Sequence, residues 1–186
     1  MIRFATKNDA DFVAPLMFQA MEEIVFKLIG KEDENQAVSF LKTLFLEEKN
    51  QYSYQNTIVF EEDNAVIGSL VFYDGADLEH FRKPVLTLAE QISGRKIAVE
   101  DETSAGEIYI DTVSVSPRGQ GKGIGSQLIS FLQNYVAENQ LGKIGLLVDE
   151  NNPKAEKLYT RLGFVYANNQ TLAGGNYKHL VFEKIK

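Results

Sequence analysis

The chain has 186 residues, and its 26 acidic and 19 basic side chains give a formal net charge of −7. This length favours one domain, and 44% hydrophobic residues can form its core, so disordered and fibrous classes are excluded. The acidic balance argues against nucleic acid and anionic membranes as partners, because like charges repel. The absence of cysteine excludes thiolate zinc sites, iron–sulfur clusters and a cysteine nucleophile, and no metal site is predicted.

The first residues, MIRFATKNDAD, predict a cytoplasmic protein. Charge begins at the third residue, and the apolar core of a signal peptide is lacking. No apolar run approaches the roughly 18 residues of a membrane-spanning helix.

The chain begins with a predicted strand from Ile2 to Ala5. Thr6 and Asp9 have the spacing of a capping box, which predicts the start of a helix. Apolar residues at helical spacing give this helix a buried stripe, formed by Val13, Leu16, Met17, Ala20, Met21 and Ile24. We expect Pro15 to kink or break it, because proline lacks the backbone N–H.

Residues 25–34 are charged and predict a loop before a second helix at about 35–47. Two strands at 56–61 and 65–73 then predict a β-hairpin. Residues 74–106 are less regular, with a short helix at 84–92 between exposed loops. An insertion of this length within a compact domain is usually functional or mobile.

The second half predicts a strand at 107–115, a glycine-rich loop and a helix from Ile124 to about Asn139. An apolar strand at 143–149 suits the middle of a sheet. Asn152 then caps a helix that starts with Pro153 and stops at Gly163. Its predicted buried stripe consists of Ala155, Leu158, Tyr159 and Leu162. Strands at 164–167 and 177–185 close the chain around a loop at 168–176.

The glycine-rich loop alternates four glycines between a strand and a helix, at Gly119, Gly121, Gly123 and Gly125. Free backbone N–H groups and the helix dipole make such a loop an anion site, to which Lys122 adds charge. A turn without a ligand is the simpler alternative. The P-loop pattern fails, because Lys122 is followed by glycine instead of serine or threonine.

A dinucleotide-binding fingerprint is a closer alternative for the same loop. Gly121, Gly123 and Ser126 approximate GxGxxG, and Asp149 ends the next strand where a ribose-binding acid could lie. However, the third glycine is missing, and helices and a hairpin lie upstream where further βαβ units are required. An NAD-binding oxidoreductase is therefore only the third hypothesis for the function.

Two motifs give the chain a specific resemblance. The first is Gln120-Gly121-Lys122-Gly123-Ile124-Gly125 after Val115-Ser116-Pro117, and the second combines Asn152, Ala155, Leu158-Tyr159 and Gly163-Phe164. With both motifs, the chain resembles the GNAT superfamily of acyl-CoA-dependent N-acetyltransferases over nearly its whole length. The resemblance implies an α/β fold whose mixed, mostly antiparallel sheet of six or seven strands has splayed central strands and is flanked by about four helices. The insertion at 74–106 is longer than the family usually carries.

The resemblance further implies acetyl-CoA as cosubstrate. Its pyrophosphate would lie on the backbone N–H groups of residues 121–126, and its pantetheine arm would pair with the strand near Val113 to Val115. Tyr159 would protonate the leaving thiolate, although a tyrosine there can also be a packing residue. The implied cofactor-binding residues are Val113, Ser114, Val115, Gln120, Gly121, Lys122, Gly123, Ile124, Gly125, Ser126 and Asn152, the last of which can also be only a helix cap.

An amine acceptor with a pKa near 10.4 must lose a proton before attack, at a cost of about 4 to 5 kcal/mol at pH 7. Asp111 is two residues from Val113, so the period of a strand predicts that both lie on one face. Asp111 is our first choice of base, and Glu107 on that face or a water molecule is the second. The alternative is that both acids are merely exposed on the sheet.

The acceptor itself has no signature in the sequence. The helices at 6–47, the insertion and the loop at 168–176 should frame its pocket, where acids such as Glu22, Glu23 and Glu79 would suit a cationic amine. We expect a primary amine of a small molecule, peptide or protein, acetylated directly in a ternary complex because no cysteine or Ser-His-Asp arrangement is present. A noncatalytic acyl-CoA-binding or sensory module is the alternative, a homodimer is left open, and His80 and His179 receive no role.

Overall fold

The computed structural model describes residues 1–183, which form one seven-stranded sheet and five α-helices. The strands are β1 (Ile2–Phe4), β2 (Thr57–Glu62), β3 (Ala65–Asp74), β4 (Glu107–Val115), β5 (Lys143–Asp149), β6 (Val165–Leu172) and β7 (Gly175–Phe182). The helices are α1 (Ala10–Ile29), α2 (Glu34–Leu46), α3 (Leu78–Ser93), α4 (Ile124–Glu138) and α5 (Pro153–Arg161). The last residues of the strand predicted at 177–185 lie outside the described part of the chain.

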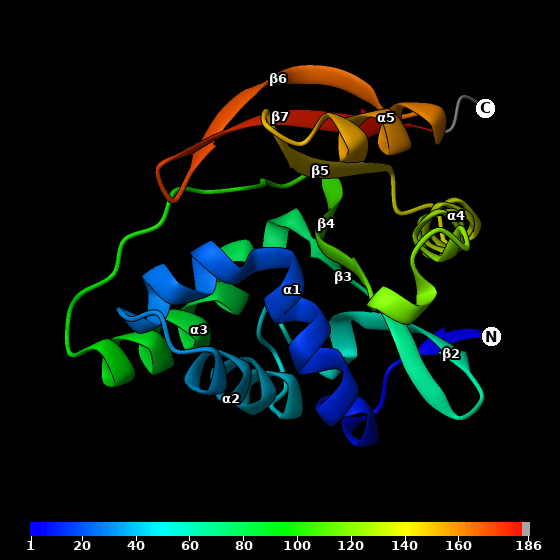
Figure 1. The fold of residues 1–186 in the computed structure, drawn as a ribbon. Helices are drawn as coiled ribbons and strands as arrows, with labels where there is room; N and C mark the ends of the chain where they lie inside the picture. Colours follow the sequence, from blue (N-terminus) through cyan, green and yellow to red (C-terminus); the bar gives the residue numbers. More distant parts are fainter. Residues whose placement is uncertain (184–186) are drawn as a thin grey trace.

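The sheet has the order β1-β2-β3-β4-β5-β7-β6, and among these described strands only the β4–β5 pair is parallel. These two strands pair only from Glu107 opposite Lys143 to Ile110 opposite Leu146. Beyond those four residue pairs they separate, as Figure 1 shows near the centre of the fold. The predicted mixed sheet with splayed central strands is therefore confirmed.

A β-bulge lies in β4 where this separation begins. Val71 of β3 is opposite Thr112, while the next residue, Phe72, is opposite Ile110. Asp111 is the extra residue, and a bulge shifts the alternation of side chains by one position. The prediction that Asp111 and Val113 lie on one face is therefore wrong.

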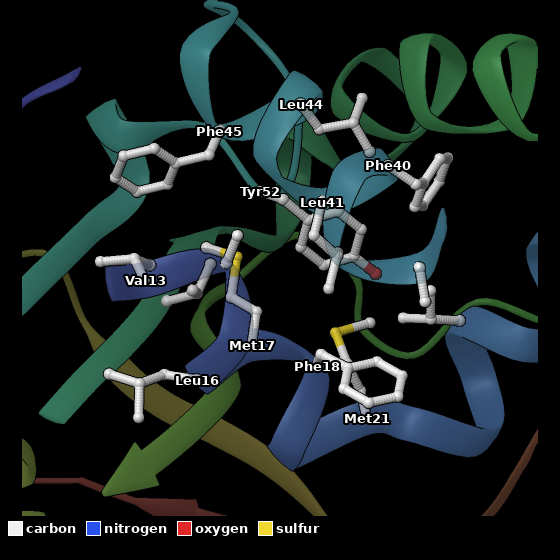
Figure 2. Packing of buried hydrophobic residues seen from close by; sticks show 14 of the residues in the cluster. Val13, Leu16, Met17, Phe18, Met21, Phe40, Leu41, Leu44, Phe45 and Tyr52 are labelled. Carbon is white, nitrogen blue, oxygen red and sulfur yellow. The ribbon is translucent and has the colours of Figure 1, made fainter. Parts of the chain in front are cut away.

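Helices cover both faces of the sheet (Figure 1). On one face α1, α2 and α3 form a core with β-strand residues such as Val59 and Val71. Figure 2 shows α1 residues such as Val13 and Met17 in one cluster with Leu41 and Phe45 of α2. On the other face α4 and α5 pack against strand residues such as Ile110. The site described below lies between these layers, where the sheet opens.

Three details of α1 differ from prediction. The helix continues through 25–29, where Val25, Leu28 and Ile29 are buried, and it ends at Gly30 with φ 78°. Its irregular residue is Met21, with φ −141° and ψ 32°, and not Pro15. Pro15 is exposed near the start of the helix, where water can bind the carbonyl that it leaves unpaired. In the predicted stripe Ala20 is exposed and Ile24 half-buried.

The insertion is more ordered than predicted. After a 3-10 turn at Gly75–Asp77, α3 starts six residues before the predicted helix and contains Pro84 in its second turn. Its buried face includes a charged residue, Arg82. The predicted loop at 168–176 is also mostly strand, because β6 and β7 join through a tight turn with positive φ at Ala173 and Gly174.

The α5 helix begins as predicted, with the Asn152 side chain accepting a hydrogen bond from the N–H of Ala155 at 3.1 Å. Its apolar stripe is only half-buried, however, because this helix borders an open cavity. In the described part of the chain, no helix has the length and apolar character needed to cross a membrane.

Candidate functional site

A cavity of about 760 Å³ lies where β4 and β5 separate. It is bounded by α1, β4, β5, the start of α5, the insertion and the tip of the β6–β7 hairpin. The insertion and α1 thus frame it as predicted, whereas α2 does not contribute to the lining. The charged residues among those that line it are Glu22, Glu23, Arg82, Glu102, Asp111 and Asp149. Five carboxyl groups against one guanidinium make the wall acidic, although Glu79 is not part of it.

The glycine-rich loop leads from β4 into α4 beside this cavity. Gly121 and Gly123 have φ of 77° and 76°, the left-handed region that glycine adopts without strain, and a Cβ on either would meet no atom within 4 Å. Among residues 1–183, no backbone carbonyl accepts from the N–H groups of Gly121, Gly123, Ile124, Gly125 and Ser126. Unpaired N–H groups in open space at a helix N-terminus fit an anionic group such as a phosphate.

Two cations lie near the loop. The Lys122 ammonium is 3.3 Å from Glu62 Oε2 in an exposed ion pair, which holds it only weakly. The Arg161 guanidinium of α5 donates to the Ser126 hydroxyl at 3.2 Å. The second cation was not anticipated from the sequence, because only the tertiary fold brings α5 to the start of α4.

The edge of β4 that faces the cavity is open beyond Ile110. The N–H of Ser116 bonds the carbonyl of Ile67 in β3, so by alternation the backbone groups of Val113 and Val115 point to the other edge. There the Val115 carbonyl accepts from the amides of Gln19 at 2.9 Å and Gln120 at 3.3 Å. In the part of the chain that the structure describes, no strand lies opposite the N–H groups of Val113 and Val115, which leaves room for an extended chain.

The side chains of β4 divide between the two faces of the sheet. Val113 and Val115 pack with the core under α4, and Ser114 accepts from Gln19 of α1 at 3.0 Å. Thr112 lines the cavity, and its buried hydroxyl has no partner among the described residues. Together the edge and this face present both backbone and hydroxyl groups to a ligand.

Asp111 is held in a buried polar network. Its Oδ2 is 3.1 Å from the hydroxyl of Tyr73, and that hydroxyl is 3.0 Å from Glu102 Oε1. The Gln51 amide donates to both Tyr73, at 2.9 Å, and Glu102, at 2.6 Å. Arg82 forms an ion pair with the other Glu102 oxygen. The network therefore connects β4, β3 and the insertion.

The environment of Asp111 changes its acidity. Burial, together with the negative charge of Glu102, raises its pKa to about 8, against the weaker opposing effects of Tyr73 and Arg82. Burial and the charge of Asp111 also raise the pKa of Tyr52 and of Tyr109, which both line the cavity. A carboxyl group with a pKa near neutrality can exchange a proton in either direction under physiological conditions.

Tyr159 lies across the cavity from this network, on α5. Its ring packs against Phe164, and burial raises the pKa of its hydroxyl to about 12. The described part of the chain offers that hydroxyl no hydrogen-bond partner, although the residue lines the cavity. A phenol in this state keeps its proton and can donate it to a ligand. Asn152 lines the same cavity while it caps α5.

The structure places Glu107 elsewhere. Its carboxylate contacts Nε2 of His179 at 3.0 Å and the Thr103 hydroxyl at 2.7 Å, and it does not line the cavity. Although burial opposes the change, these hydrogen bonds lower the pKa of Glu107. Of the two acids considered from the sequence, only Asp111 thus faces the cavity.

The hairpin tip is tied to the opposite side of the cavity. The Lys27 ammonium at the end of α1 donates to the Ala173 carbonyl at 2.7 Å. The Ala173 N–H donates to the carboxylate of Glu100 in the insertion at 2.8 Å. We call these two contacts the Ala173 clasp. Leu172 and Tyr177, on either side of the turn, line the cavity.

The sequence reasoning missed the partners of Asp111. One signal was available, because Tyr109 precedes Asp111 by two residues in the same strand and lies directly opposite Tyr73. The buried pair of Arg82 and Glu102 had no signal of its own, because charged residues in an irregular segment are normally exposed.

A family model for the acetyltransferase (GNAT) family matches residues 23–164 of the chain. A crystal structure of an acetyltransferase is 30% identical, with a TM-score of 0.83 over 98% of both chains. An N-acetyltransferase from Staphylococcus aureus Mu50 is 25% identical, with a TM-score of 0.86 over 97% of this chain and 99% of that one.

Among curated relatives, the chain is similar to the mycothiol acetyltransferase of Tsukamurella paurometabola. The two are 42% identical over 62 residues, which are 33% of this chain and 20% of that protein. The chain thus matches about a fifth of the length of that relative.

Proposed function

Because the chain belongs to the acetyltransferase (GNAT) family, we propose that it transfers the acetyl group of acetyl-CoA to a primary amine of a small molecule or peptide. The observation that carries this proposal is one cavity in which an open strand edge, a half-buried acid with a raised pKa and a free phenol meet. The glycine-rich loop adds an anion site at the mouth of the same cavity.

The proposed cosubstrate fits these groups. The unpaired N–H groups of Gly121 and of residues 123–126 would hold its pyrophosphate, with the side chains of Lys122 and Arg161 nearby. Its extended arm would pair with the open edge at Val113 and Val115, and Asn152 would contact it from α5. Acetyl-CoA supplies an activated acyl group as a thioester. The N–H groups at that edge would stabilise the oxyanion formed on attack.

The proposed proton transfers use two residues of the cavity. Asp111 would take a proton from the ammonium group of the acceptor and release the amine for attack. Tyr159 would give its proton to the leaving thiolate. Transfer would be direct, in a ternary complex, because the sequence has no cysteine to carry the acyl group. The acidic wall with Glu22 and Glu23 favours an acceptor that arrives as a cation.

An acetylation screen tests this proposal. The chain is incubated with acetyl-CoA and a panel of polyamines, aminoglycosides, amino acids and N-terminal peptides of ribosomal proteins, and products are detected by mass spectrometry. We expect one acceptor class to be acetylated in the presence of the parent chain and much more slowly with Asp111→Asn. Binding of acetyl-CoA with no acetylated product would favour a noncatalytic acyl-CoA-binding module instead.

A further inference from the structure

We propose that Glu102 and Arg82, both supplied by the insertion at 74–106, are positioning residues that keep the carboxyl group of Asp111 protonated in the free protein, through the hydroxyl of Tyr73. The inference rests on the proposed function only because Asp111 is the base there. The protonation state itself follows from the arrangement of hydrogen-bonding groups.

More carboxyl oxygens lie within hydrogen-bond distance of the Tyr73 hydroxyl than it has protons to donate. It lies 3.0 Å from Glu102 Oε1 and 3.1 Å from Asp111 Oδ2, and it has one proton to donate. The Gln51 amide already donates to its oxygen at 2.9 Å. With both carboxyl groups ionised, one of them would face a lone pair of Tyr73 at hydrogen-bond distance. This repulsion is removed when one carboxyl group carries a proton and donates it to Tyr73.

The ion pair decides which carboxyl group keeps the proton. Arg82 contacts Glu102 directly, and its guanidinium is fixed further by the carbonyl of Glu100 at 3.0 Å and by Asp101 at 2.6 Å. Glu102 also accepts from Gln51 at 2.6 Å, so its negative charge is well satisfied. Among residues 1–183, Asp111 has neither a cation nor an amide donor in contact. Tyr73 therefore donates to Glu102, and Asp111 donates to Tyr73.

The other groups around Asp111 act in the same direction. The hydroxyl-bearing rings of Tyr52 and Tyr109 are buried beside it, and they are neutral. Glu22 and Glu23 of α1 and Asp149 of β5 line the same cavity and add negative charge. Together with burial they disfavour a second carboxylate next to Glu102, in agreement with the raised pKa of Asp111.

This resting state has a chemical consequence. Asp111 must first release its proton to water, and the Tyr73 hydroxyl then turns to donate to the new carboxylate. The carboxylate next takes a proton from the ammonium group of the acceptor, which gives a neutral amine and a neutral carboxyl group again. The insertion thus sets the pH above which the base is available, although neither Glu102 nor Arg82 takes part in the transfer.

Infrared difference spectroscopy of the unliganded protein tests this directly, because it needs neither acceptor nor turnover. The carboxylic acid band that disappears in Asp111→Asn identifies Asp111, and its intensity is followed against pH. In the parent we expect a midpoint at about 8. Glu102→Gln should lower the midpoint by about one unit or more, a tenfold change in proton affinity. Tyr73→Phe should also lower it, because the protonated carboxyl group loses the hydroxyl oxygen to which it donates, and the competition of two carboxylates for one hydroxyl proton is removed.

Asp101→Asn is the matched control, because Asp101 pairs with the same Arg82 but is 77% exposed and does not contact Tyr73. Its midpoint should equal that of the parent. An Asp111 group already ionised at pH 6, or a midpoint unchanged by Glu102→Gln, would overturn the inference. If Glu102→Gln does not fold, the downward shift in Tyr73→Phe decides, and its absence overturns the inference equally. A titration as expected without acetylation of any amine would contradict the proposed function alone.

Discussion

Asp111 and Val113 are two residues apart in β4, yet their side chains lie on opposite faces of the sheet, because the bulge at Asp111 shifts the alternation. Val113 packs under α4 and leaves its backbone edge free, while Asp111 enters the polar network on the side of α1. One short segment therefore offers backbone hydrogen bonds to one ligand and a carboxyl group to another.

Replacement of Gly123 tests the anion site. Gly123→Val should weaken binding of acetyl-CoA, because a β-branched residue at φ 76° costs about 1–2 kcal/mol and disturbs the unpaired N–H groups after it. Calorimetric titration of the folded variant and the parent measures the effect. Gly142→Val is the control, because Gly142 also has a positive φ of 93° and open surroundings but lies after α4. Equal affinities for Gly123→Val and the parent would refute the anion site.

Asp111→Asn tests the base. We expect a lower kcat/KM and the loss of the acidic limb that Asp111 contributes to the pH profile at about 8. Affinity for acetyl-CoA should change little, because the open edge of β4 is kept. The profile is measured with the acceptor found in the screen. An acidic limb that persists in the variant would assign deprotonation to a water molecule.

The same substitution makes a prediction about stability. The pKa of Asp111 rises from 3.8 in the unfolded chain to about 8 in the fold, so the folded state binds more protons between these values. The contribution of Asp111 to the free energy of unfolding is therefore full below about pH 4 and is lost as the pH rises through 8. Asp111→Asn should become progressively more stable than the parent over that window. Urea denaturation at several pH values measures the difference, and a constant difference would contradict the raised pKa.

Tyr159→Phe separates the chemistry of the hydroxyl from the packing of the ring. We expect kcat to fall by about 10²-fold, which corresponds to about 2.7 kcal/mol in the barrier. The melting temperature should stay near that of the parent, because the described residues provide the hydroxyl no hydrogen bond to lose. A lower melting temperature with an unchanged kcat would assign Tyr159 to structure.

Substitution of Gly75 in the insertion should lower the stability of the fold. A Cβ there would overlap the carbonyl oxygen of Ser104, a backbone atom that cannot move away easily. Gly75→Ala should therefore lower the free energy of unfolding by about 1–3 kcal/mol. Gly125→Ala is the control, because its Cβ would meet its nearest atoms at 3.9 Å. Urea denaturation compares both with the parent, and equal losses would show that the contact with Ser104 has no special effect.

Local patterns predicted the regular elements well. The bounds of β4 and β5 match the predicted strands, and the Asn152 cap starts α5 where expected, because alternation and capping act over a few residues. The alternation of side chains along a strand predicts the face on which each one lies only where the strand pairing has no bulge, however. The bulge at Asp111 depends on the register of β4 against β3, which lies far away in the sequence.

The site was predictable only in part for a similar reason. Asp111, which was chosen from the period of the strand, lines one cavity together with Tyr159 and Asn152 of the second motif, and their roles there stay predictions. The sequence did not indicate that Arg82 and Glu102 belong to the site, because a buried ion pair between a helix and a later loop produces no periodic pattern of residues in either segment. Its members become recognisable only when the fold has removed both from water.

The Ala173 clasp lies at the open end of the sheet, beyond the pair of Asp149 with Tyr177. The four residue pairs between β4 and β5 form a junction between two halves of the sheet. One half consists of β1 to β4, and the other consists of β5, β7 and β6. A contact far from this junction restricts the angle between the two halves more strongly than a contact close to it, because the same displacement there corresponds to a smaller rotation. The contacts of Lys27 and Glu100 with Ala173 are contacts of this kind, so they act on the angle at which the two halves open, although neither side chain lines the cavity.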